Sequence, residues 1–212
     1  HEAGHAIAGG GMPKADGVQK VTIIPRGRAG GYTLFLPDED RNYMSVSQFE
    51  AQLAVALGGR VAEEIVFGDV TTGASSDITT VTRIARAMVT RYGMSPKLGP
   101  IAFGEKDELI FLGREISEQR NYGDDVARSI DAEVHRIVDE AYGRAREILT
   151  INRTVLNDMS SALIEYETIA GERLREFMSR VKQIQLPEPH VNGNGNGSAP
   201  TTPLVDVPNT IA

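Results

Sequence analysis

Apolar residues recur every three or four positions through most of this chain. That spacing places them on one face of a helix and is typical of amphipathic helices that pack against a core. The stretches with this pattern are residues 47–67, 77–92, 123–150, 153–166 and 169–182. The longest of them, 123–150, repeats the pattern for about seven turns. The sequence therefore predicts a mainly helical protein with long helices in its C-terminal half.

A different pattern occupies the region before residue 40. Residues 18–25 are rich in β-branched side chains, and residues 32–37 form a second short apolar run between glycines and a proline. Such runs, separated by a glycine-containing turn, are typical of paired strands. We therefore expect a small β-sheet or hairpin near the N-terminus of the helical protein.

The composition changes at Gln183. Residues 183–212 contain half of the ten prolines, an Asn-Gly repeat and no lysine or arginine. A segment of this kind does not contain enough apolar surface to bury a core. We expect a packed domain over 1–182 and a disordered low-complexity tail over 183–212. His190 lies in that tail and is no candidate for a metal ligand.

Composition narrows the classes of function. Of the 212 residues, 41% are apolar and 24% charged, which is ordinary for a soluble globular domain. The net charge of −7 argues against a nucleic-acid partner. The absence of cysteine excludes disulfides and thiolate metal sites. No apolar run approaches the roughly 18 residues of a membrane span, so the fragment itself is expected to be soluble.

The candidate chemistry lies at the very start of the chain. His1, Glu2 and His5 form an H-E-x-x-H pattern on a helix predicted for residues 1–9 and ended by the glycines that follow. Residues four apart share a helical face, so both imidazoles can bind one zinc ion while Glu2 serves as a general base. The competing interpretation is a set of solvated side chains on an exposed helix.

The residues alone leave the third metal ligand open. Glu63 and Glu64 follow on the helix predicted at 47–67 and are candidates for a ligand or for a partner of a histidine ligand. Asp77 begins the next predicted helix, where capping alone accounts for it. Gly58 and Gly59 lie in mid-helix, and we expect them to pack closely against the helix of the metal site.

Five stretches together resemble the proteolytic domain of FtsH, the membrane-anchored ATP-dependent zinc metalloprotease family. They are the opening pentapeptide and residues 21–27, 57–64, 71–74 and 92–95. The resemblance covers about residues 1–180 and omits the tail. It implies that Asp77 completes a Zn²⁺ site with His1 and His5, with Glu63 or Glu64 as the alternative ligand. One departure is Ser76, where the family usually has asparagine.

The resemblance also implies properties of a longer parent protein, of which this chain is expected to be a piece. Family members carry membrane spans and an AAA ATPase module, assemble as homo-hexamers and degrade unfolded or membrane proteins. The proteolytic domain would then lie on the cytoplasmic side of the membrane. No G-x-x-x-x-G-K-[ST] stretch occurs here, so ATP would bind only in the missing module.

The predicted reaction is peptide-bond hydrolysis by a zinc-activated water, with Glu2 taking the proton and passing it to the leaving amine. Two other hypotheses about the function remain open. One is a stand-alone soluble metallopeptidase. The other is a non-enzymatic helical assembly module with a vestigial metal site.

Overall fold

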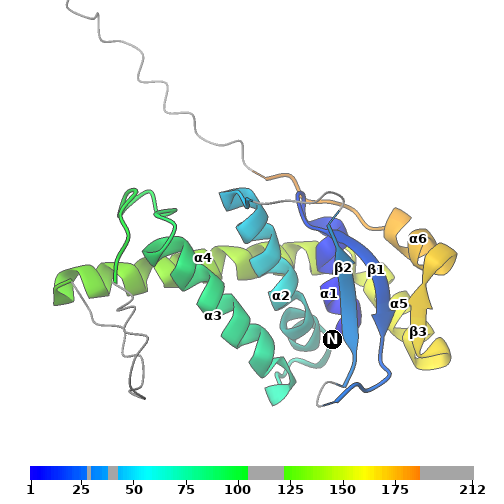
Figure 1. Cartoon of the computed structure of the whole chain (residues 1–212). Coiled ribbons are helices and arrows are strands. Elements are labelled where there is room, and N and C mark those ends of the chain that lie inside the picture. The colour runs from blue at the N-terminus through cyan, green and yellow to red at the C-terminus, as the bar shows by residue number, and fades with distance from the viewer. Residues whose placement is uncertain (28–29, 38–42, 105–121, 187–212) are drawn as a thin grey trace, which may run out of the picture.

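The computed structural model describes residues 1–27, 30–37, 43–104 and 122–186. Its first helix, α1 (Glu2–Gly11), lies at the centre of the molecule, between α2 and the sheet, and also contacts α4 and α5 (Figure 1). The other helices are α2 (Val46–Phe67), the 3₁₀ turn η1 (Thr72–Ala74), α3 (Ser75–Thr90), α4 (Asp124–Ile151), α5 (Arg153–Tyr166) and α6 (Gly171–Ser179). The prediction of a mainly helical fold with a small sheet near the N-terminus is confirmed.

Glycines allow α1 and α2 to approach until their backbones touch. A Cβ atom on Gly4 would lie 2.4 Å from the carbonyl oxygen of Gly58, and one on Gly58 would lie 2.7 Å from that of Gly4. A side chain larger than hydrogen at either position would therefore force the helices apart. This confirms the expectation that the mid-helix glycines of α2 pack against the helix of the metal site.

The glycines at the end of α1 were expected to stop the helix after residue 9. Instead, α1 continues through them to Gly11. They lie within it because other side chains occupy the space of a Cβ. A Cβ on Gly9 would lie 2.6 Å from the Phe35 ring, and one on Gly11 would lie 2.3 Å from Ile148. Close packing thus compensates for the low helix propensity of glycine.

The sheet consists of β1 (Gly17–Thr22), β2 (Tyr32–Leu36) and β3 (Thr168–Ala170), all antiparallel, in the order β2-β1-β3. The first two strands form the predicted pair, with Thr22 opposite Tyr32. The third strand was not predicted, and residues 169–170 were assigned to the last helix, which begins only at Gly171. Three residues are too few to show the period of a strand. Among the described residues, β2 has no strand on its outer edge.

α2 begins at Val46, one residue before the predicted start, and Ser45 is its N-cap. The Ser45 hydroxyl accepts from the Gln48 amide, and the Gln48 side chain accepts from the Ser45 amide at 2.7 Å. This reciprocal pair satisfies two backbone donors and fixes the start of the helix.

The C-terminal part of the described chain packs back onto α1. Ile184 is 6% exposed, and its amide donates to the Gly11 carbonyl at 3.0 Å. The buried Asn152 side chain pairs with the backbone of Lys182. Ile184 therefore packs with the helical part of the chain. The rest of the predicted tail, 187–212, lies outside the described residues.

Among the helices that the structure describes, none is long and apolar enough to cross a membrane.

Candidate metal centre

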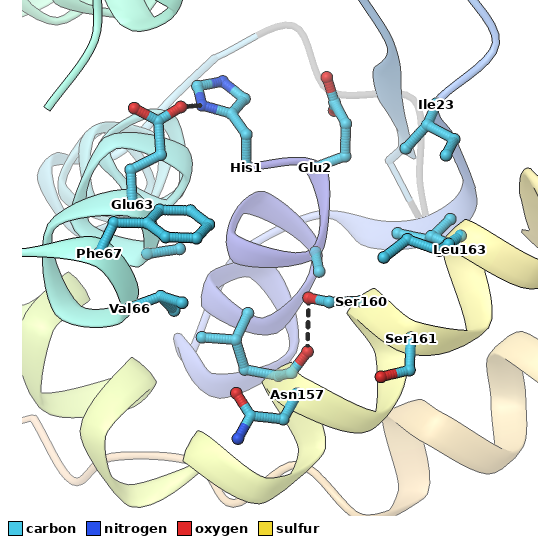
Figure 2. Close-up of a pocket in the computed structure, with 14 residues that line it drawn as sticks. His1, Glu2, Ile23, Glu63, Val66, Phe67, Asn157, Ser160, Ser161 and Leu163 are labelled. Carbon is cyan, nitrogen blue, oxygen red and sulfur yellow. Dashed lines mark hydrogen bonds and ion pairs between the residues drawn. The ribbon is translucent and has the colours of Figure 1, made fainter. Parts of the chain in front are cut away.

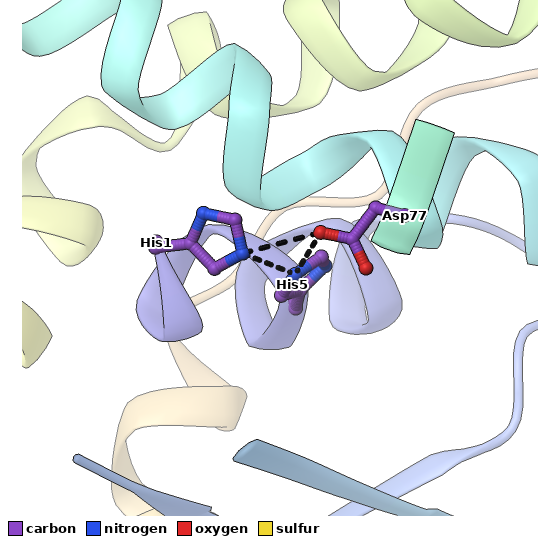
Figure 3. A group of neighbouring side chains, drawn as sticks. All are labelled: His1, His5 and Asp77. Atoms are coloured by element: carbon purple, nitrogen blue, oxygen red, sulfur yellow. Dashed lines mark hydrogen bonds and ion pairs between the residues drawn. The ribbon is translucent and has the colours of Figure 1, made fainter. Parts of the chain in front are cut away.

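Three side chains from α1 and α3 converge on one point (Figure 3). The His1 and His5 Nε2 atoms are 3.1 Å apart, and the Asp77 Oδ2 lies 3.2 Å from the first and 3.5 Å from the second. Ligands of a tetrahedral zinc ion, bound at about 2.0–2.1 Å, are separated by about 3.3 Å. The three atoms therefore have the spacing of one face of a zinc coordination tetrahedron.

Hydrogen bonds at the far side of each ring determine which nitrogen carries the proton. His5 Nδ1 lies 2.8 Å from the Val55 carbonyl oxygen, which can only accept, so Nδ1 must donate. His1 Nδ1 donates likewise to Glu63 Oε1 at 2.8 Å. In the neutral rings both Nε2 lone pairs then face each other and the Asp77 carboxylate. Three acceptors at this distance repel unless a cation lies among them.

Without a metal ion, a proton on His1 supplies the positive charge between these acceptors. The hydrogen bond to Asp77 is the main cause that raises the pKa of His1 from 6.5 to about 9, against the opposing effect of burial. Burial is the largest single influence on Asp77 and favours its neutral form. The interactions with His1 and His5 together outweigh it and hold the pKa of this carboxyl well below its usual range. Metal uptake must therefore displace a proton from His1.

Gly59 brings α2 directly against both rings. A Cβ at this position would lie 2.6 Å from His1 Cε1 and 2.6 Å from His5 Nε2. The next turn of α2 carries Glu63, which is 9% exposed and faces His1. The close approach of α2 thus both confines the rings and places a carboxylate behind one of them.

Glu63 connects the two halves of the site. Its Oε1 accepts from His1, while its Oε2 accepts from the amide and hydroxyl of Thr71, at 3.3 and 3.2 Å. Thr71 caps the turn η1, which leads directly into α3 and Asp77. Glu63 is thus a partner of His1, one of the candidate ligands, and a tether for the segment that carries the aspartate. Glu64 instead pairs with Tyr142 and Arg146 of α4.

Replacing Glu63 with glutamine is expected to weaken zinc binding by about ten- to a hundredfold, because the charge that orients and polarises His1 is lost while its ligand atom remains. Zinc titration against a competing chelator measures the change. Glu64→Gln is the matched control, since it alters the adjacent residue of the same helix. A zinc dissociation constant for Glu63→Gln within twofold of that of the control would contradict the assigned role.

Glu2 lies beside the three converging residues rather than among them. It occupies the first turn of α1, on the side of the sheet, while Glu63 lies on the opposite side of His1 (Figure 2). Thr33 donates a hydrogen bond of 3.0 Å to Glu2 Oε2. The carboxylate is half-buried next to the metal-ligand candidates, which is where a group accepting a proton from a nearby water must lie.

A pocket of about 390 Å³ opens next to His1 and Glu2 (Figure 2). Its walls come from the start of α1, the end of α2, α5 and Ile23. Most of the lining side chains are apolar, and Phe67 and Ile164 at its rim are 77% and 78% exposed. The space beside the metal centre therefore accepts an apolar group of moderate size.

Sequence reasoning missed two contributors to the site. Val55 acts through its backbone carbonyl, which no side-chain pattern reveals, and Thr71 acts through a tether that exists only in the folded chain. Of the other histidines, His135 is exposed on α4, away from the centre, and His190 lies outside the described residues.

Comparison with known proteins agrees with this arrangement. The family model described as peptidase family M41 matches residues 1–177. The chain is 74% identical over 189 residues to the ATP-dependent zinc metalloprotease FtsH of Chloroflexus aggregans, which covers 88% of this chain and 29% of that protein. It is 51% identical over 199 residues to the protein of the same name from Rubrobacter xylanophilus, which covers 92% and 31%. The chain thus spans about three-tenths of the length of these curated relatives. The resemblance to the FtsH proteolytic domain is confirmed.

Proposed function

The chain belongs to peptidase family M41, and from this premise we propose that it is a zinc-dependent endopeptidase domain. His1, His5 and Asp77 hold the metal, and Glu2 is the general base. The observation that carries the proposal is the convergence of two imidazole nitrogens and one carboxylate oxygen, each within 3.5 Å of the others. Three protein ligands leave a fourth position open, as zinc hydrolases require.

Each residue has a defined part in the reaction. Zinc in such a site lowers the pKa of a coordinated water to about 7 and polarises the scissile carbonyl. Glu2 accepts the proton of the attacking water and then donates it to the leaving amine. Glu63 and the Val55 carbonyl hold the two rings with their Nε2 lone pairs toward the metal.

Two surfaces next to the site suit an extended, unfolded peptide. The outer edge of β2 offers backbone donors and acceptors that bind any sequence in extended form. The pocket beside His1 accepts an apolar side chain. Unfolded proteins and membrane proteins expose apolar side chains of this kind, so we propose that they are the substrates.

The relatives are named as ATP-dependent proteases and are about three times as long as the matched region. We propose that the complete protein has their ATP-dependent activity. Following the family resemblance, it would be a membrane-anchored homo-hexamer with this domain on the cytoplasmic side. The helices α4, α5 and α6 would then contribute contacts between subunits. Membrane fractionation and the native mass of the complete protein test this assembly.

Removal of the metal tests the proposed function most directly. We expect chelation with 1,10-phenanthroline to abolish casein hydrolysis, because no residue of the site activates water alone, and one equivalent of zinc to restore it. Zinc content and casein cleavage are measured on the same samples. If the chain binds no zinc, the non-enzymatic alternative is supported instead. The same holds if the complete protein binds zinc but does not cleave casein.

A further inference from the structure

Thr33 contacts Glu2 from outside α1 through its side-chain hydroxyl. Its hydroxyl lies 3.0 Å from Glu2 Oε2 and also 3.0 Å from the Glu2 backbone carbonyl oxygen. Thr33 is 31 residues from Glu2 along the chain, on β2, whose outer edge has no strand beside it in the part of the chain that the structure describes. A tertiary contact therefore connects the general base directly to the strand that borders the site.

Gly31, just before β2, completes the surroundings of this carboxylate. A Cβ at Gly31 would lie 3.0 Å from Glu2 Cγ and 3.1 Å from Glu2 Oε1. Gly31 is itself buried and close to the Thr22 carbonyl of the neighbouring strand, so it has no room to move away. The turn into β2 therefore leaves space for one oxygen of Glu2 while Thr33 binds the other.

We propose that Thr33 is a positioning residue for the general base and that its hydrogen bond fixes which oxygen of Glu2 receives the proton of the water. This inference rests on the proposed function of Glu2. A hydroxyl donates only one hydrogen bond at a time, and a charged carboxylate accepts it more strongly than a neutral group. While Glu2 is ionised, Thr33 donates to Oε2 and leaves Oε1 as the oxygen that receives the proton of the water.

The test compares Thr33→Val, which keeps the shape and removes the hydroxyl, with Thr33→Ser, which restores the hydroxyl. A general base that is no longer held in place is expected to lose about ten- to a hundredfold in rate, because its oxygen is less often aligned with the attacking water. We expect Thr33→Val to lower kcat by that factor with KM within about twofold of wild type. Thr33→Ser is expected to recover most of the loss. The measurements are made on the zinc-loaded chain with a fluorogenic casein-derived peptide.

Thr168→Val is the matched control, because Thr168 is a hydrogen-bonded threonine of the same sheet whose partner is Thr22 rather than Glu2. Zinc content and the melting temperature are determined for every variant. The inhibition constant of a peptide hydroxamate gives a second readout that does not depend on turnover. It should rise for Thr33→Val and recover for Thr33→Ser.

The outcomes separate this inference from the proposed function. If wild type binds zinc and cleaves the peptide while Thr33→Val matches Thr168→Val in kcat and in hydroxamate binding, the role of Thr33 is refuted and the proposed function stands. If Thr33→Val loses zinc, Thr33 supports the metal site rather than the base, which also overturns the inference. If wild type neither binds zinc nor cleaves the peptide, the proposed function itself fails.

Discussion

Replacing Glu2 with glutamine is expected to lower kcat/KM for peptide hydrolysis by about 10²–10⁴-fold while the protein still binds one zinc ion. The magnitude is that of losing a positioned general base. Zinc is retained because Glu2 is not among the three converging ligand atoms. Glutamine has nearly the same shape as glutamate and still accepts a hydrogen bond from Thr33, so the change is confined to proton transfer. Peptide cleavage and zinc content of the purified variant measure the two quantities.

The matched control for this variant is Glu172→Gln. Glu172 is likewise an acidic residue in the first turn of a helix, but it is exposed on α6. Any effect of removing a negative charge from a helix N-terminus should appear in both variants, whereas the loss of activity should appear only in Glu2→Gln. Normal casein cleavage by Glu2→Gln would refute the assignment of Glu2 as the base.

Replacing Asp77 with alanine is expected to reduce zinc affinity by at least a factor of about 100. Complete structural zinc sites contribute about 10–16 kcal/mol, so one protein ligand of three accounts for several kcal/mol. Peptidase activity should be lost at zinc concentrations that saturate wild type. Competition with a chelator measures the affinity. The comparison is Glu64→Ala, because Glu64 is the remaining alternative ligand and pairs with Tyr142 and Arg146.

The metal-free form of Asp77→Ala offers a second measurement. Asp77 is the main cause of the raised His1 pKa, so the His1 titration observed by NMR should move from about 9 down toward 6.5. A pKa raised by folding stabilises the folded state below pH 6.5, and this contribution disappears as the pH rises through about 9. The variant should lack this dependence. In the zinc-binding test, an unchanged affinity in Asp77→Ala together with a loss of affinity in Glu64→Ala would show that Glu64, and not Asp77, is the third ligand.

Local patterns in the sequence were sufficient to predict most of the helices and the proximity of His1 and His5. The apolar stripe of α4 and the span of α5 agree with their predicted positions, because each pattern repeats over several turns and reflects one buried face. The pairing of His1 with His5 is equally local, since helical geometry alone brings residues four apart onto one face. Where the signal was short, as for the three residues of β3, the element was not predicted.

The tertiary structure decided what depends on contacts distant in sequence. Asp77 reaches the two histidines because η1 and α3 are tethered through Thr71 to Glu63, and Glu63 in turn binds His1. Choosing Asp77 over Glu64 from the residues alone was not possible, because both are acidic residues on helices. The choice depends on which helix face meets α1. The backbone contact of Gly4 with Gly58 determines that face, and no periodicity along a single segment encodes it.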